Sequence, residues 1–336
     1  RVRVVFRVIG NNVVGMGHIY RCLSLAHGMA NQDILFVCDV DSESVVKRLV
    51  GPVYWLGVYD TKNIADKIIS LNPNLVVNDV LNTEKTYVEY LKKEEIFVVN
   101  FEDLGSGASV ADLTVNELYD YSILSGNNIL WGYEHFFVRE EFEKARPNKF
   151  RESVAEVILA FGGTDQHDLS RLVYERINEI CRKYQIFIRI VTGPGYRGFT
   201  RLEKIVSKAS GVSLTHATGV ISSIMENADI AITSNGRTVY ELAHMNIPGI
   251  VIPQHEREET HSFAREENGF IKLEPYVEGM SLEKVPQLLE KLIANKQFRN
   301  SLFSRLEKFC FLQNKQRLLD KIFDRCKGRK NILQHG

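Results

Sequence analysis

The feature that most constrains this chain is a repeated alternation of short apolar runs with amphipathic stretches of helical length. Apolar runs rich in β-branched residues, bounded by turns and followed by helices, are typical of parallel strands buried on both faces. In the first half, the pattern predicts strands at 2–8, 34–38, 75–78, 96–100 and 112–115, and helices near 18–30, 43–49, 64–71 and 84–93. In the second half, it predicts strands at 156–161, 186–192, 229–233 and 249–252, and helices near 169–183, 201–208, 219–226, 238–244 and 261–268.

The periodicity stops in a charged stretch near the middle of the chain, and a length of 336 residues suits two domains better than one. We therefore predict an α/β protein with two Rossmann-like, doubly wound domains that face a cleft. The N-terminal domain is expected over 1–140, a linker over 141–152 and the C-terminal domain over 153–336. The last part is expected to be helical, at 288–295, 298–311 and 317–323, and such terminal helices often pack across a domain junction.

Composition narrows the function classes. Lys and Arg together number 42, as do Asp and Glu, and this balance argues against a nucleic-acid-binding protein. The five cysteines are scattered without a Cys-x-x-Cys pair, which favours a reducing cytoplasm over a disulfide framework or zinc site. The apolar runs are strand-sized, well below the ~20 residues of a membrane span. We expect a cytoplasmic protein without a nucleic-acid partner, membrane span, metal or cofactor.

The first motif is a glycine-rich loop that joins the first predicted strand to a helix. It contains Gly15-Met-Gly-His18, and its spacing differs from the Gly-x-Gly-x-x-Gly pattern of NAD sites. Because the positive end of a helix disfavours imidazolium, His18 is expected to stay neutral and to act as a general base facing the cleft. A structural hydrogen bond at the start of the helix is the alternative interpretation of His18.

The second motif, Gly162-Gly163-Thr164-Asp165, follows a predicted strand and precedes a helix for which Asp168 is a plausible cap. Glycines at the carboxyl end of a parallel strand mark the place where α/β folds bind ligands. A tight strand-to-helix turn without a ligand explains the same residues.

The third motif is more specific. A strand ends at Thr233, and the polar turn Ser234-Asn-Gly-Arg-Thr238 opens the next helix. Ser234, Gly236 and Thr238 offer hydroxyl and backbone donors to a diphosphate at the start of that helix. Glu241, one turn further, could accept both hydroxyls of a ribose, although a carboxylate in a first turn is also ordinary compensation of the helix dipole.

Polar residues also follow other predicted strands. The loop from Gln254 to His261 carries two histidines six residues apart, which is not a metal-binding spacing in a helix. This loop is expected either to face sugar hydroxyls or to be a solvated start of a helix. Asp79 and Asp103 lie just beyond strands of the first domain, where polar groups tend to line the cleft.

These motifs, in this order, resemble those of the UDP-sugar hydrolases of pseudaminic acid biosynthesis and of related spore-coat polysaccharide proteins. The resemblance rests on Phe6-Arg7, Gly15-Met-Gly-His-Ile-Tyr-Arg21, Trp131-Gly-Tyr-Glu-His-Phe-Phe-Val-Arg-Glu-Glu-Phe142, Phe161-Gly-Gly-Thr-Asp165 and Ser234 through Glu241. It implies a glycosyltransferase-B-like fold, close to the peptidoglycan GlcNAc transferase, and cleavage of a UDP-sugar by water in nonulosonic-acid or surface-polysaccharide biosynthesis. It also implies that His18 activates the water. The substrate-binding residues expected from the motifs and the resemblance are Gly15, Gly17, Arg21, Asp79, Gly162, Gly163, Thr164, Ser234, Asn235, Gly236, Arg237, Thr238, Glu241 and Arg257.

The chain departs from the family pattern at three places. Ile9 stands where the family has an Asp, Leu81 where it has a Tyr, and Arg257-Glu258 where it has an Asn-Gln pair. Because several of these positions contact the sugar in the family, we expect that the sugar differs, that the acceptor differs, or that the module has lost activity.

Three hypotheses follow. The first is hydrolysis of a UDP-activated amino sugar, with His18 as base and with helix N-termini and Arg237 meeting the charge of the departing UDP without a metal. The second is a glycosyltransferase that uses the same donor with a sugar or lipid-linked acceptor. The third is a non-catalytic module that binds a sugar nucleotide within a larger protein. The absence of an initial Met leaves room for fusion to, or partnership with, another sugar-biosynthesis enzyme.

Overall fold

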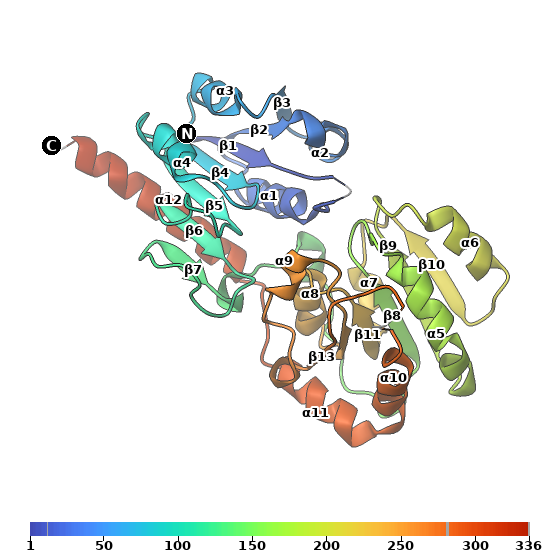
Figure 1. Cartoon of the computed structure of the whole chain (residues 1–336). Coiled ribbons are helices and arrows are strands. Elements are labelled where there is room, and N and C mark those ends of the chain that lie inside the picture. The colour runs from blue at the N-terminus through green and yellow to red at the C-terminus, as the bar shows by residue number, and fades with distance from the viewer. Residues whose placement is uncertain (12, 280–281, 335–336) are drawn as a thin grey trace. The chain divides into compact units, whose positions relative to one another are not determined.

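The computed structural model describes residues 1–11, 13–279 and 282–334, and the chain forms two compact units, each built on its own parallel sheet (Figure 1). The first unit comprises Arg1–Arg139 and the end of the chain from Phe311, and the second comprises Glu140–Cys310. The expected linker over 141–152 is therefore part of the second unit. The expected assignment of all residues after 153 to one domain is wrong for the last helix, which belongs to the first unit.

The first unit contains a seven-stranded sheet in the order β3-β2-β1-β4-β5-β6-β7, with every neighbouring pair parallel. The sequence runs of Val, Ile and Phe form its central strands, which are buried on both faces. The strands are β1 (Arg3–Val8), β2 (Asp33–Asp39), β3 (Trp55–Tyr59), β4 (Leu75–Asp79), β5 (Phe97–Phe101), β6 (Leu113–Asn116) and β7 (Ile129–Trp131). The helices are α1 (Gly17–Gly28), α2 (Glu43–Val50), α3 (Ile64–Ser70), α4 (Lys85–Lys92) and α12 (Asn314–Gln334).

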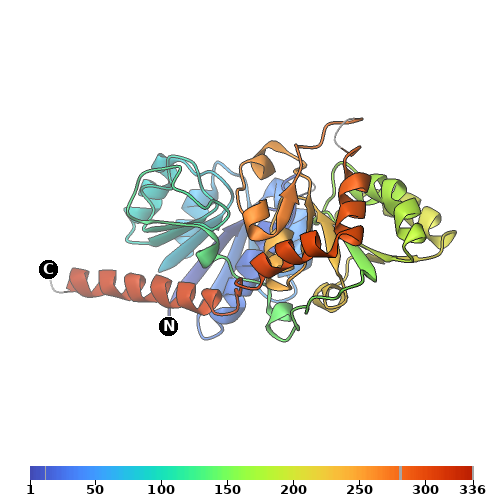
Figure 2. The same cartoon turned by 90° about the horizontal axis from the view of Figure 1, so that it is seen from below.

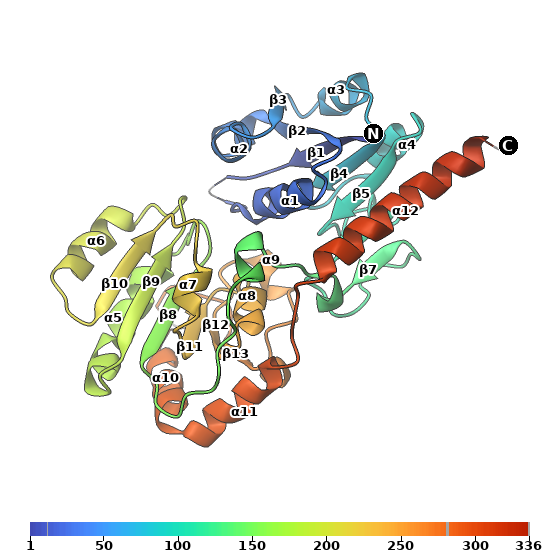
Figure 3. The same cartoon turned by 180° about the vertical axis from the view of Figure 1, so that it is seen from behind.

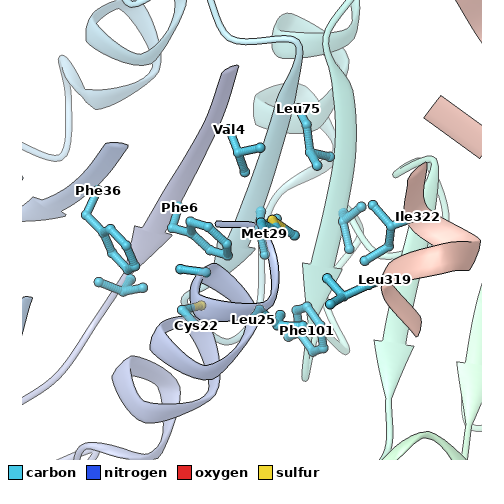
Figure 4. Packing of buried hydrophobic residues seen from close by; sticks show 14 of the residues in the cluster. Val4, Phe6, Cys22, Leu25, Met29, Phe36, Leu75, Phe101, Leu319 and Ile322 are labelled. Carbon is cyan, nitrogen blue, oxygen red and sulfur yellow. The ribbon is translucent and has the colours of Figure 1, made fainter. Parts of the chain in front are cut away.

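One face of this sheet packs on α1, α2 and α12, and the other packs on α3 and α4. Helix α12, drawn in red, comes from the end of the chain and lies beside α1 (Figure 2). Its Leu319 and Ile322 enter the same hydrophobic cluster as Phe101 and Leu75 (Figure 4). The last helix is therefore part of the core of the first unit.

The second unit contains a six-stranded parallel sheet in the order β10-β9-β8-β11-β12-β13. Helices α5 and α6 lie beside strands β8 to β10 (Figure 3). The strands are β8 (Glu156–Ala160), β9 (Phe187–Thr192), β10 (Val212–His216), β11 (Ile230–Thr233), β12 (Gly249–Val251) and β13 (Phe270–Lys272). The α-helices are α5 (Leu169–Lys183), α6 (Phe199–Ser207), α7 (Ser222–Met225), α8 (Thr238–His244), α9 (Glu256–Glu259), α10 (Val285–Ala294) and α11 (Lys296–Leu306).

The structure corrects two local expectations in the second unit. No continuous helix covers 261–268, where the structure has α9 before this range and a short 3-10 turn at Glu266–Asn268. Asp168 does not cap α5, because its backbone is left-handed and Asp165 accepts the hydrogen bonds from Leu169 and Ser170 N–H instead. In the described part of the chain, no helix is long and apolar enough to cross a bilayer.

Both sheets reverse their strand order beside the first strand, at β1/β4 in the first unit and at β8/β11 in the second. In open α/β sheets, ligands bind outside the carboxyl ends of the strands at this reversal. The topology thus makes the loops that follow β1 and β4, and those that follow β8 and β11, the candidate ligand-binding loops.

Candidate functional site

At the strand reversal of the first unit, five charged or titratable side chains form a buried group, here named the His18 cluster. They come from the start of α1, the end of β4 and the residues directly after β5 and β6, and they are His18, Arg21, Asp79, Glu102 and Glu117. Each is at most 7% exposed. Charged side chains are rarely buried unless they are paired, so this burial requires the mutual contacts that follow.

Asp79 is the centre of the His18 cluster. Its Oδ1 lies 2.6 Å from His18 Nδ1 and accepts from Arg21 Nη2 at 2.6 Å, while its Oδ2 accepts from Arg21 Nε at 2.6 Å. Arg21 Nη1 donates to Glu117 Oε1 at 2.8 Å. Both oxygens of Asp79 are therefore engaged by side chains of α1.

The charges of the cluster fix the tautomer of His18. Burial alone would raise the pKa of the Asp79 carboxyl, but the charge of Arg21, together with the hydrogen bonds from Arg21 and His18, outweighs burial and holds this pKa well below its usual range. An ionised carboxylate only accepts hydrogen bonds, so His18 Nδ1 carries the hydrogen and Nε2 is left as the proton-accepting nitrogen of the neutral ring. For Arg21, burial acts to lower the pKa, but the negative charges of Asp79 and Glu117 raise this pKa well above its usual value.

Sequence reasoning identified three members of the cluster and missed Glu102 and Glu117. Glu102 Oε2 lies 3.8 Å from His18 Nε2, and Glu102 Oε1 lies 3.9 Å from Arg21 Nη2. Both glutamates directly follow buried strands, and that position would have pointed to them. Asp103, the neighbour that was expected to line the cleft, is fully buried and accepts from Thr83 and Asn100 instead.

The glycine-rich loop before α1 also lies at this reversal. Gly15 has a φ of +79°, which favours glycine, and its backbone pairs with Asn11. Gly17 is the first residue of α1. The loop thereby turns the chain so that His18 and Arg21 reach Asp79 from one side of the helix.

In the second unit, the loops after β8 and β11 meet at the strand reversal. Gly162 has a φ of +84°, and a Cβ placed on it would lie 3.9 Å from Ser234 Oγ. A Cβ placed on Gly193 would lie 2.4 Å from Gly163 Cα, so these two backbones are in close contact. Thr164 is half-buried in the same loop. The structure therefore brings Gly162 and Ser234 together, as the strand order requires.

The turn after β11 is held by its own side chains. Asn235 Nδ2 donates to the main-chain oxygens of Glu258 at 2.6 Å and His261 at 3.0 Å. Asn235 therefore ties the turn to the loop after β12. The other predicted residues of this group range from buried to half-buried; they are Ser234, Gly236, Arg237, Thr238 and Glu241.

The loop after β12 carries Glu258, a buried carboxylate that the sequence analysis considered only as a departure from the family pattern. Glu258 is 7% exposed and its Oε1 accepts from Gln254 N–H at 2.9 Å. Burial raises the pKa of Glu258 to about 7, against the lowering effect of the N–H groups of Gln254 and Asn235. Its neighbour Arg257 is half-buried.

Residues 157–312 match the family described as Glycosyltransferase family 28 C-terminal domain. Among solved structures, MurG of Acinetobacter baumannii superimposes with a TM-score of 0.67 at 12% identity, over 96% of this chain and 100% of that chain. The chain has a glycosyltransferase-B fold.

Two curated proteins are similar in sequence. The spore coat polysaccharide biosynthesis protein SpsG of Bacillus subtilis is 23% identical over 261 residues, which cover 73% of this chain and 75% of that protein. An uncharacterized protein of Methanocaldococcus jannaschii is 26% identical over 268 residues, which cover 74% of this chain and 54% of that protein. The chain thus spans about half the length of the archaeal relative. The similarity to each protein thus covers about three quarters of this chain.

Proposed function

We propose that this protein hydrolyses a UDP-activated amino or deoxy sugar and releases UDP, with His18 as the general base. The observation that carries the proposal is the 2.6 Å contact of His18 Nδ1 with a buried, ionised Asp79 at the strand reversal. A carboxylate in this position orients the ring, fixes its tautomer and stabilises the imidazolium that forms when Nε2 takes a proton. This arrangement suits a base that removes a proton from water as the sugar–UDP bond breaks.

The second unit is proposed to hold UDP. Support comes from the match of residues 157–312 to a glycosyltransferase domain and from the meeting of the Gly162 and Ser234 loops at the carboxyl ends of their strands. Hydrogen-bond donors in the turn from Ser234 to Thr238 would bind the diphosphate, and Arg237 would neutralise part of its negative charge. Glu241 would accept hydrogen bonds from the ribose hydroxyls. We also propose that the protein acts in nonulosonic-acid or surface-polysaccharide biosynthesis and that it is fused to, or associates with, another sugar-biosynthesis enzyme.

A glycosyltransferase is the second candidate, because the matched domain is named for that activity and the chain resembles MurG in fold. Ile9 and Leu81 replace residues that contact the sugar in the resembled hydrolases, which leaves room for a different acceptor. The two candidates share the donor and differ in the nucleophile, so formation of a product only when an acceptor is supplied would favour transfer.

The donor class is tested by calorimetry or thermal shift with UDP, UDP-GlcNAc, CMP and NAD, on the wild type and on Glu241→Ala. We expect stabilisation by the UDP compounds alone and its loss in Glu241→Ala. The control is Glu203→Ala, which removes an exposed carboxylate from α6 of the same unit and should bind UDP like the wild type. A response to CMP or NAD instead of UDP would refute the assignment of the second unit.

A further inference from the structure

Strand β3 (Trp55–Tyr59) is an outer strand of the first sheet, and within the described residues it pairs with β2 alone (Figure 1). The outward N–H and C=O groups of an edge strand form a template on which another strand can pair. Proteins usually block such an edge with lysine, proline, a bulge or a very short strand. Strand β3 has five residues, Trp-Leu-Gly-Val-Tyr, in unbroken register with β2, so none of these devices blocks its edge.

One face of β3 carries two aromatic side chains. Trp55 and Tyr59 lie on the same face as Gly57, because alternate residues of a strand share a face. A Cβ placed on Gly57 would lie 2.8 Å from Trp55 Cη2 and 2.6 Å from Tyr59 Oη, so the two rings converge over this glycine. Trp55 is 48% exposed and Tyr59 is half-buried. Exposed aromatic side chains of this kind are typical of protein interfaces.

The sequence of β3 suits pairing with itself. In an antiparallel pair with β3 of a second copy, centred on Gly57, Trp55 of each copy lies opposite Tyr59 of the other, and Leu56 lies opposite Val58. Residues directly opposite each other have Cβ atoms about 4.5–5.5 Å apart, and aromatic cross-strand pairs stabilise a sheet. A twofold axis requires such reciprocal contacts. The edge therefore fits a second copy of this chain.

Helix α2 (Glu43–Val50) adds charge complementarity. It packs on β2 and β3, with Glu43 exposed in its first turn and Lys47 and Arg48 exposed near its end. None of these three side chains forms an ion pair with another described residue. Strands about 4.8 Å apart, with a helix above each β2–β3 pair, bring the two α2 helices to about 10 Å, the distance of packed helices. The twofold axis makes them antiparallel, so Glu43 of each copy lies near Lys47 and Arg48 of the other.

We propose that two copies of this chain associate through β3 in an antiparallel, twofold arrangement that joins their seven-stranded sheets and packs α2 against α2. The association goes beyond the proposed hydrolysis and does not depend on it. Specific interfaces bury roughly 1,200–2,000 Å² in total, and one strand with one short helix per copy falls at the lower end of this range. The dimer is therefore expected to dissociate on dilution.

The test measures the oligomeric state of the full chain by sedimentation velocity between about 1 and 200 µM. We expect the wild type to shift from monomer to dimer and to form no larger species, because the twofold arrangement is closed. Trp55→Lys places a charge on the edge and should raise the dissociation constant at least about tenfold. The control is Tyr121→Lys, at a 59% exposed aromatic residue after β6 of the same unit, which should associate like the wild type.

A charge exchange on α2 tests the arrangement of the two copies. Glu43→Lys brings like charges together and should weaken association by roughly 3–10-fold. The triple variant Glu43→Lys, Lys47→Glu and Arg48→Glu reverses both signs and should restore association to near the wild-type level. A thermal unfolding scan confirms that each variant is folded, and hydrogen exchange of wild-type residues 55–59 should slow as the protein concentration rises.

Each outcome decides the matter. A wild type that stays monomeric at every concentration, or that forms open-ended polymers, would refute the twofold association. A dimer that Trp55→Lys does not weaken, or one that leaves exchange at 55–59 unchanged, would show that copies associate through another surface. Failure of the triple variant to restore association lost in Glu43→Lys would contradict antiparallel packing of the two α2 helices.

Discussion

His18 and Asp79 are 61 positions apart in the sequence and meet because β1 and β4 are neighbours in a parallel sheet. Asp79 is the last residue of β4, and α1, which follows β1, turns His18 toward it. Arg21, one helical turn after His18, neutralises the buried carboxylate with two hydrogen bonds of 2.6 Å. His18 is therefore oriented by a charge that is itself compensated inside the protein.

This arrangement predicts the effect of Asp79→Asn. The amide keeps the shape but loses the charge, so it no longer enforces the tautomer of His18 or stabilises its protonated form. UDP release should fall by roughly 10³–10⁴-fold while the affinity for UDP stays near that of the wild type. Asp66→Asn, an exposed carboxyl of α3, should leave UDP release unchanged. A folded Asp79→Asn variant with near-normal turnover would contradict the role of Asp79.

Glu258 makes the stability of the second unit depend on pH. Its pKa is raised by burial from 4.5 to about 7, so the folded state holds the proton more tightly than the unfolded chain between these values. The stabilising contribution of the protonated form is complete below the unfolded pKa and is lost as the pH rises through the folded pKa.

Replacement by glutamine tests this dependence. Glu258→Gln removes the titrating group, so it should raise the melting temperature at about pH 8 and have little effect at about pH 4.5. Each kcal/mol corresponds to roughly 2–4 °C in a unit of this size. Glu259→Gln, at the exposed neighbouring position on the same helix, should show no such trend in a pH series of thermal unfolding. An equal effect of Glu258→Gln at both pH values would refute the buried carboxyl's role.

At the scale of residues, the sequence was enough to identify the members of the His18 cluster that stand in a local motif. It was not enough to identify those that only the strand order brings to His18. His18 and Arg21 stand in a recognisable loop-to-helix motif, and Asp79 follows a predicted strand. Glu102 was overlooked because the predicted strand ended at Asn100, one residue before the observed end at Phe101. Its contact with His18 depends on which strands are neighbours, and no local pattern encodes that.

At the scale of elements, the sequence identified the central strands and missed four at the margins. The missed strands are β3, β7, β10 and β13, and each is an edge strand of its sheet. Edge strands are partly exposed and lack the continuous apolar run that marks a buried parallel strand. Strand β10 is half-buried at every position, and β7 and β13 have only three residues each.

The helix expected at 261–268 failed for a different reason. The main-chain oxygen of His261 accepts from Asn235 Nδ2, and Phe263 stacks on Tyr240 with ring centroids 4.4 Å apart. Such tertiary contacts override a local helical pattern. Asp168 was expected to cap α5 on the same local grounds, but Asp165 reaches the first N–H groups from three residues further upstream.

The packing of α12 predicts that truncation of one of its buried side chains lowers the stability of the first unit. Leu319 is 2% exposed and packs in the core of the first unit, so Leu319→Ala should lower the free energy of unfolding by about 2–4 kcal/mol. Asp324→Ala, on the exposed face of the same helix, is the matched control and should change it by less than about 0.5 kcal/mol. Chemical denaturation measures both, and a small effect of Leu319→Ala would show that α12 is not part of that core.

At the scale of the whole molecule, the chain is two parallel-sheet units with a glycosyltransferase-B fold, and its last helix returns to the first unit. The first unit provides the His18 cluster, and the second provides the glycine loops and the turn from Ser234 to Thr238. Under the proposed function, the first unit carries out the proton transfer and the second unit retains UDP. A change in one unit should affect one of these properties and spare the other.

The most direct test of this account is UDP release from a panel of UDP-N-acetylhexosamines without an added acceptor, measured together with UDP binding, on the wild type and His18→Ala. The account predicts UDP and free sugar from the wild type. It also predicts that His18→Ala loses turnover by roughly 10²–10⁴-fold and still binds UDP. No UDP release by the wild type from any of these substrates, or equal rates for the wild type and His18→Ala, would contradict it.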